Sequence, residues 1–177
     1  MKGKRGLSSV VSVVIITALV VAAIAIVWSF VENTITDRID ETTSCYDTMG
    51  ELSFDNDYTC YNITSDDSEI RFKIDRGDIN IEGVLISVKT EAETRSYKLT
   101  SEARDVSGLT NYPEREGTVL LPGKSEGETF IIENFPLNTS LNQETGLRLL
   151  AYPITGGGQC DNPSDSIKNV YSCSVFN

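Results

Sequence analysis

The side chains that most often carry catalysis are scarce in this sequence. Its 177 residues include no histidine, the commonest general base and a frequent metal ligand. Serines are plentiful, but there is no histidine to activate one as a nucleophile. The 26 acidic residues are scattered, and no spacing singles out a catalytic pair. The sequence therefore argues against an enzyme, identifies no catalytic residue and implies no cofactor.

Four cysteines are the reactive side chains whose chemistry is clearest. Their number is even and none lies in a CxxC pair of the zinc-binding kind, so we expect two disulfides and an oxidising compartment. Four cysteines allow three pairings. We favour Cys45–Cys60 with Cys160–Cys173, because these pairs close the shortest loops at the lowest entropic cost.

Other short motifs are weaker. Asn62 and Asn138 each begin an Asn-x-Ser/Thr sequon, which makes them candidates for glycosylation on an exported domain. The acidic groups at 55–57 and 161–165 lack the twelve-residue order of a calcium loop, so we predict no metal site. The tripeptide at 76–78 reads Arg-Gly-Asp, a known adhesion sequence, but a hairpin turn with its glycine at positive φ explains it better.

These groups must be positioned by a chain that begins with an apolar segment, residues 7–31, LSSVVSVVIITALVVAAIAIVWSFV. It contains no charge, proline or glycine. As a helix it would span roughly 35–40 Å, enough for a hydrocarbon core of about 30 Å. Lys2, Lys4 and Arg5 precede it, so the N-terminus should stay in the cytoplasm and the remainder should be exported. That remainder has a formal charge near −14, which argues against nucleic acid or anionic lipid as a partner.

The residues in front of the apolar segment are informative about processing. An ordinary secretory signal has a shorter apolar region and a cleavage site of small residues, whereas Trp28 and Phe30 crowd the end of this one. The order Lys-Arg-Gly followed by a serine-bearing apolar helix resembles the N-terminus of archaeal type IV pilins and archaellins. The resemblance implies that a prepilin peptidase cuts between Gly6 and Leu7. A cut after Gly3 is the less favoured alternative, since it would leave two basic residues ahead of the helix.

The same resemblance implies an assembly function. A membrane-inserted precursor would be extracted by an assembly ATPase and a membrane platform into a helical homo-oligomer on the cell surface, with adhesion or surface attachment as the role. A motility filament, a minor priming subunit and a membrane-anchored ectodomain that never polymerises are the alternatives. The resemblance gives no outer-surface ligand and does not separate these filament types.

The apolar segment also carries a stripe of small residues suited to close packing of helices. The stripe recurs at i, i+4, i+7 and i+11 and comprises Ala18, Ala22, Ala25 and Ser29. A plain membrane anchor is the alternative reading of these positions. From residue 31 onward, one apolar face of the same helix continues among charged residues, through Val31, Ile35 and Ile39. We expect the helix to end at 42–44.

Alternating apolar and polar residues replace the helical period after residue 44. They predict about eight short strands separated by turn residues, with a bulge at Gly83. The segments 83–88, 96–99 and 147–154 also resemble the exported domains of archaeal pilin-like proteins. We therefore expect an α+β chain, with a long N-terminal helix before an antiparallel β-sandwich or barrel. The expected divisions are a leader at 1–6, a helix at 7–44 and a β domain at 45–177.

Overall fold

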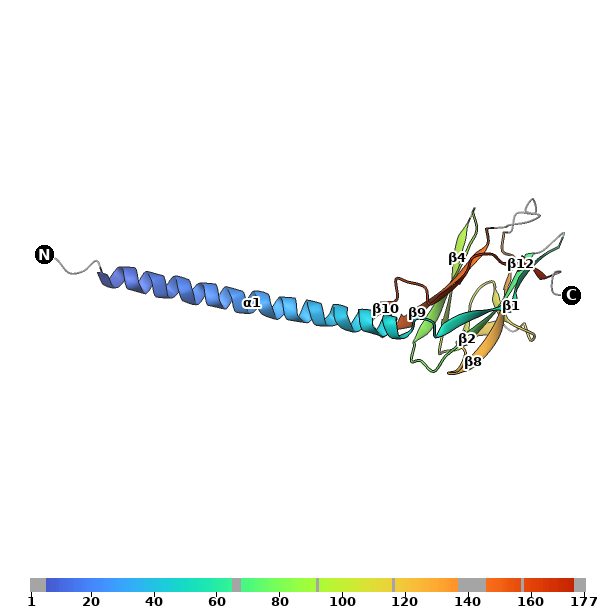
Figure 1. The fold of residues 1–177 in the computed structure, drawn as a ribbon, viewed down its shortest axis with the longest axis horizontal. Helices are drawn as coiled ribbons and strands as arrows, with labels where there is room; N and C mark the ends of the chain where they lie inside the picture. Colours follow the sequence, from blue (N-terminus) through green and yellow to red (C-terminus); the bar gives the residue numbers. More distant parts are fainter. Residues whose placement is uncertain are drawn as a thin grey trace. The chain divides into compact units, whose positions relative to one another are not determined.

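The computed structural model describes residues 6–64, 68–91, 93–115, 117–136, 146–156 and 158–173. Within these residues the chain has one long helix, α1 (Gly6–Asp47), and strands follow it (Figure 1). Two compact units divide at Asp40 and Glu41, so the last turns of α1 belong to the same unit as the strands. We describe each unit by itself.

Helix α1 is continuous because its sequence holds neither proline nor glycine after Gly6. Two of its threonine hydroxyls are satisfied inside the helix, since Thr17 Oγ1 donates to Val14 O at 2.9 Å and Thr34 Oγ1 donates to Phe30 O at 2.9 Å. An apolar helix can therefore carry these hydroxyls without leaving them unbonded.

The C-terminal end of α1 differs from the sequence prediction. The helix runs through 42–44 to Asp47, and Gly50 then takes a φ of 81°. Thr48 Oγ1 donates to Cys45 O at 2.8 Å and Thr48 N donates to the same carbonyl at 3.3 Å. These bonds, together with the disulfide at Cys45, stabilise a final turn that threonine and serine propensities alone disfavour.

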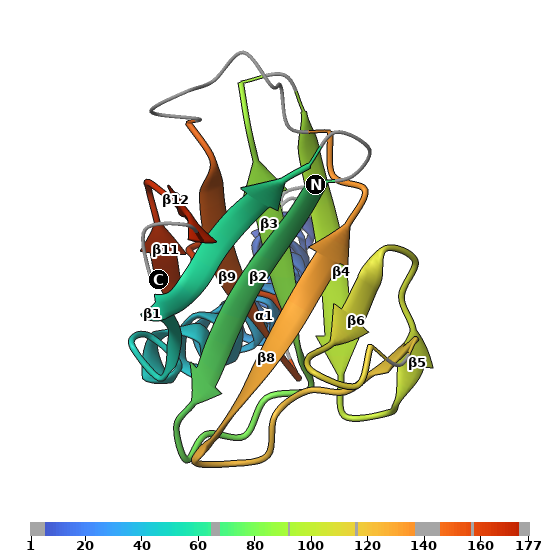
Figure 2. The same ribbon diagram turned by 90° about the vertical axis from the view of Figure 1, so that its right-hand side faces the viewer.

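The described part of the β domain contains two five-stranded sheets, and Figure 2 shows them as two layers, with β1, β2 and β8 in front of β3, β4 and β9. The first sheet has the order β12 (Tyr171–Ser172), β1 (Leu52–Ile63), β2 (Ser68–Arg76), β8 (Glu126–Glu133) and β6 (Leu109–Asn111). The second sheet has the order β10 (Gly158–Gln159), β9 (Arg148–Thr155), β3 (Gly83–Lys89) and β4 (Thr94–Thr100), and β11 (Asp165–Ile167) also pairs with β9. A small pair joins β5 (Arg104–Asp105) to β7 (Thr118–Val119). The pairs are antiparallel except β1 with β12, which is parallel.

A single hydrophobic core takes side chains from both sheets. On the first sheet, Phe72 lies between two aromatic neighbours, with ring centroids 6.0 Å from Phe54 and 5.6 Å from Phe130. On the second sheet, Ile86 and Leu149 are fully buried in the same cluster. The prediction of an apolar helix followed by an antiparallel β domain is confirmed, and its alternating strands supply this core.

The predicted bulge is in the wrong strand. Gly83 pairs regularly with Thr100 and Ile154. A Cβ at this position would lie 2.5 Å from Leu99 O, so close backbone approach explains the glycine. The irregular ladder is in β1, where the register shifts between Asp55 and Cys60. Asp57 N donates to Asp55 Oδ1 at 3.0 Å, a local bond that stabilises this bend.

Glu128 makes the stability of the β domain depend on pH. It pairs across the sheet with the fully buried Ile74. Burial is the main cause that raises the pKa of its carboxyl, and the nearby charges of Glu114 and Glu126 raise this pKa further. The folded state therefore binds this proton more tightly than the unfolded state, and stability is lost as pH rises through the raised pKa.

We expect Glu128→Gln to raise the melting temperature at pH 7, because glutamine carries no charge to desolvate. The gain should shrink as pH falls below the ordinary glutamate range of about 4.3, where the wild-type carboxyl is neutral as well. Thermal unfolding followed by circular dichroism at pH 7 and pH 3.5 measures this. Glu91→Gln, at an exposed turn, is the control; an equal gain in both variants, or one independent of pH, would contradict the interpretation.

Candidate assembly helix and its attachment to the β domain

The first candidate site is the apolar part of α1. Residues Val10–Glu32 form a helix long and apolar enough to cross a membrane, and none of it is buried within the chain. Bulky side chains are exposed here, including Trp28 at 68% and Phe30 at 73%. A helix that is apolar on all sides needs lipid or protein around it.

The small-residue stripe lies within this span. Ala18, Ala22, Ala25 and Ser29 are all exposed, and at 3.6 residues per turn their positions fall on one side of the helix. The predicted cleavage position is at the beginning of α1, which starts at Gly6, while residues 1–5 and the side chain of Leu7 lie outside the described residues. Cleavage between Gly6 and Leu7 and close packing through the stripe both stay predictions.

All four cysteines form disulfides, but the favoured pairing is wrong. The structure links Cys45 to Cys160 with a Cα–Cα distance of 5.6 Å, and Cys60 to Cys173 with one of 4.9 Å. The loops span 115 and 113 residues, so loop-closure entropy in the unfolded chain does not decide the pairing. Strand topology decides it, because the C-terminal segments return to lie beside the beginning of the domain.

The Cys45–Cys160 disulfide joins the last turn of α1 to the segment after β10. A polar cluster lies close to it along the chain, centred on Ser164. Ser164 Oγ accepts from Gly50 N at 3.0 Å and from Leu52 N at 3.2 Å, and it lies 2.8 Å from Thr48 O. The neighbouring Asp165 Oδ2 accepts from Phe54 N at 2.7 Å. Ser164 and Asp165 therefore bind three backbone amides of the connection from α1 to β1, those of Gly50, Leu52 and Phe54.

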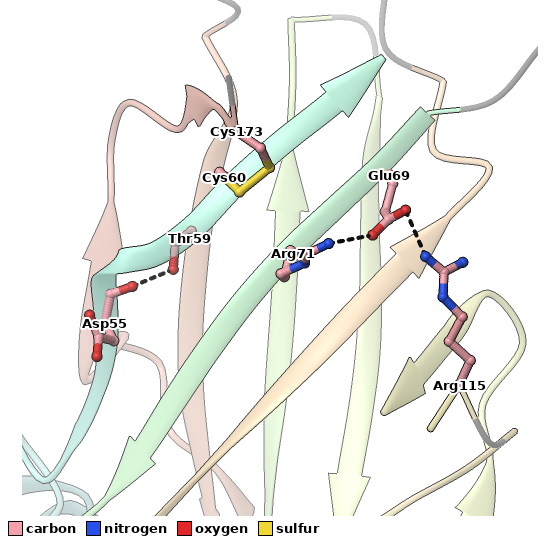
Figure 3. Close-up of a disulfide and its surroundings, with 7 residues drawn as sticks. All are labelled: Asp55, Thr59, Cys60, Glu69, Arg71, Arg115 and Cys173. Carbon is pink, nitrogen blue, oxygen red and sulfur yellow. Dashed lines mark hydrogen bonds and ion pairs between the residues drawn. A yellow bond between two sulfur atoms is a disulfide. The ribbon is translucent and has the colours of Figure 1, made fainter. Parts of the chain in front are cut away.

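The Cys60–Cys173 disulfide joins β1 to the end of β12. Strand β12 runs parallel to β1, and the pairing of Cys60 with Tyr171 brings Cys173 within bonding distance. Figure 3 shows this disulfide beside the irregular part of β1, where Thr59 Oγ1 donates to Asp55 O at 2.7 Å. The second disulfide thus attaches a two-residue edge strand that its backbone bonds alone would hold weakly.

Charged residues on the outer face of the first sheet pair with one another. Figure 3 shows Glu69 paired with both Arg71 and Arg115. The ion-pair distances are 3.4 Å to Arg71 and 3.2 Å to Arg115. Lys73 lies 3.2 Å from Asp55, and hydrogen bonds to Asp75 and Asp55 raise the pKa of Lys73. This face is therefore close to charge balance, and its cations are already bound to acids.

The remaining motifs are placed as follows. Asn62 is exposed on β1, so the first sequon is accessible to a glycosyltransferase, whereas Asn138 lies outside the described residues. In the Arg-Gly-Asp tripeptide, the Arg76 guanidinium donates to Pro122 O at 2.8 Å and to Ile79 O at 2.7 Å. Arg76 is thus bound to the domain itself. The tripeptide does not form a hairpin, because β2 pairs with β1 and β8 while β3 pairs with β4 and β9.

Comparison of the chain with protein-family models, with curated proteins and with solved structures gives no match.

Sequence reasoning considered 161–165 only as a possible calcium loop and did not identify the backbone contacts of Ser164 and Asp165. It also did not identify the stacking of Arg71, which lies 4.4 Å from the ring centroid of Tyr112. Ser164 follows Pro163 in a loop rich in turn residues, and nothing in that pattern says which backbone amides it will bind. The only sequence signal near it is Cys160, four residues earlier, which marks the loop as one that is attached elsewhere in the fold.

We expect Ser164→Ala to lower the free energy of unfolding by about 1–3 kcal/mol, because backbone groups at the α1–β1 connection lose their partner. Chemical denaturation of the full chain in detergent measures the change. Ser166→Ala is the control, since Ser166 lies two residues along in β11 with an exposed side chain. A loss no larger than that of the control would show that the Ser164 bonds contribute little.

Proposed function

We propose that this protein is a structural subunit of an extracellular filament of the archaeal type IV pilus kind, with a role in adhesion or surface attachment. The observation that carries the proposal is the combination in one chain of a 23-residue apolar helix with no buried surface and a disulfide-linked β domain with its own core. The basic-Gly-Leu-Ser leader supports the same assignment by resemblance.

In this proposal the helix has two successive environments. Before assembly it crosses the membrane with the N-terminus in the cytoplasm, in keeping with the basic residues ahead of it. A prepilin peptidase removes residues 1–6, and an assembly ATPase with its membrane platform moves the subunit into the fibre. There the helices of many copies bury one another, and the two-sheet domain, which we interpret as a sandwich-type pilin head, covers the outside.

The second candidate is a membrane-anchored ectodomain that stays a single subunit. It is favoured by the same apolar span, whose length suits one crossing of the bilayer. A minor priming subunit and an archaellin would carry the same leader as the first proposal. A low abundance in the fibre would indicate the minor subunit, and a rotating filament would indicate the archaellin. The candidates differ in the final surroundings of the helix, which are other copies of the helix in a filament and lipid in an anchored ectodomain.

The cleavage site provides the first test. We expect the mature surface protein to begin at Leu7 and to sediment in fibres. Gly6→Asp should leave the precursor uncleaved, because the bulk and charge at this position should prevent the peptidase from cutting, while Gly3→Asp should not prevent cleavage. N-terminal sequencing and negative-stain microscopy of the sedimented material measure both. Uncleaved, detergent-soluble single subunits in the wild type would refute the filament proposal and favour the anchored ectodomain.

The small-residue stripe provides the second test. Ala22→Leu should reduce fibre yield several-fold, because a larger side chain on the stripe separates helices that must approach closely. Ala23→Leu is the matched control, since it makes the same change about 100° around the helix, off the stripe. The fraction of subunit in sedimented fibres is the measurement. Equal yields from the two variants would contradict packing through this stripe.

A further inference from the structure

The outer face of the second sheet has an unusual distribution of charge. Along each strand, residues alternate between the core and the outside, and the outward positions of β3, β4, β9 and β11 include no aspartate or glutamate. Three cations, Lys89, Lys98 and Arg148, stand on this face with exposed side chains. This is a basic face on a chain whose formal net charge is −11.

None of these three cations forms an ion pair within the described part of the chain. The contrast with the first sheet is direct, because Arg71, Lys73 and Arg115 there all have acidic partners. Glu93, in the turn beside the basic face, is bound by Arg95 at 2.5 Å. Unpaired cations are therefore concentrated on one face of the domain.

Two of the cations are placed where they repel each other. Lys89 and Arg148 are direct register partners across β3 and β9. Like charges directly opposite on neighbouring strands destabilise a sheet, so the isolated domain gains nothing from this arrangement. A negatively charged ligand on this face would remove the repulsion and turn both charges into favourable contacts.

Apolar groups occupy the same face between the cations. Leu85, Leu150, Tyr152 and Ile154 are half-buried at outward positions. Small residues lie beside them, because Gly83 has no side chain and Ser96 Oγ donates to Ser87 Oγ at 3.4 Å. A face with apolar side chains and flanking cations suits an elongated partner that has an apolar stripe and flanking acids. We call these seven residues, Lys89, Lys98, Arg148, Leu85, Leu150, Tyr152 and Ile154, the basic-apolar face.

The chain itself contains a segment with the complementary pattern, the charged end of α1 from Val31 to Asp47. Its sequence has three apolar residues on one helical face and five acids against a single arginine. The apolar residues are Val31, Ile35 and Ile39, and the acids are Glu32, Asp37, Asp40, Glu41 and Asp47. At 3.6 residues per turn the five acidic positions fall within about half of the helix circumference, beside the apolar stripe.

We infer that the basic-apolar face binds the acidic end of α1 from a second copy of this chain. The inference rests on the proposed filament, in which many copies of the helix lie side by side. The contact explains why an acidic domain leaves three cations unpaired on one face, and it provides a lateral attachment between a β domain and a neighbouring helix. Charge complementarity sets the register, since opposite charges across an interface favour one alignment and disfavour others.

The test reverses charge on the face without disturbing the core. Lys98→Glu/Arg148→Glu, expressed as the only copy of the subunit, should lower the yield of sedimented fibres about tenfold, because repulsion replaces attraction on both flanks of the helix. The matched control is Arg104→Glu/Lys124→Glu, which makes the same change in net charge at two exposed cations elsewhere on the domain. Circular dichroism and non-reducing mass mapping establish that each variant is folded with both disulfides.

A compensating change identifies the occupant. Adding Glu32→Lys/Asp40→Lys to the Lys98→Glu/Arg148→Glu chain should restore at least half of the wild-type yield. Fibre yield from Lys98→Glu/Arg148→Glu equal to that of the control overturns the inference and leaves the proposed function standing. Loss of fibres without rescue also overturns it, because another partner then occupies the face. Absence of fibres from the wild type and the control refutes the proposed function itself.

Discussion

The arrangement of this protein depends on the need to bury an apolar helix that its own chain does not cover. Fifteen large apolar side chains between Val10 and Val31 are exposed. Burying each contributes roughly 1.5–3 kcal/mol, so the group amounts to on the order of 20 kcal/mol or more. That exceeds the 5–15 kcal/mol stability typical of a domain. The helix therefore requires a surrounding phase, whereas the β domain, with Phe72 and Leu149 fully buried in a shared core, does not.

Such a chain has a weak point where the helix meets the domain, and the structure concentrates covalent and polar bonds there. Cys45 and Cys160 join the end of α1 to the loop that also carries Ser164. Ser164 and Asp165 accept hydrogen bonds from backbone amides between Gly50 and Phe54. Extending the connection would therefore break these bonds. In the proposed fibre, a load on the β domain would pass through this connection to the helix, and both kinds of bond would resist its extension.

The secondary structure could largely be predicted from the sequence, whereas the disulfide pairing and the end of the helix could not. The apolar helix and the alternating strands are local patterns, and both were predicted. The disulfide pairing was predicted wrongly, because short loops are favoured in an unfolded chain while the partners of Cys45 and Cys60 are chosen by strand order. The extension of α1 to Asp47 likewise depends on Thr48 and on the disulfide, which are tertiary features that propensity does not contain.

The outer faces of the two sheets differ in how their charged residues are paired. Two β domains of such an acidic chain, whose formal charge is −11, repel each other, and in the proposed fibre that repulsion would have to be offset where subunits touch. On the first sheet, cations such as Lys73 are paired with neighbouring acids. On the second sheet, Lys89 and Arg148 remain unpaired and adjacent. In the proposed fibre, such a face on an acidic subunit would favour one orientation of a neighbour's helix against the β domain.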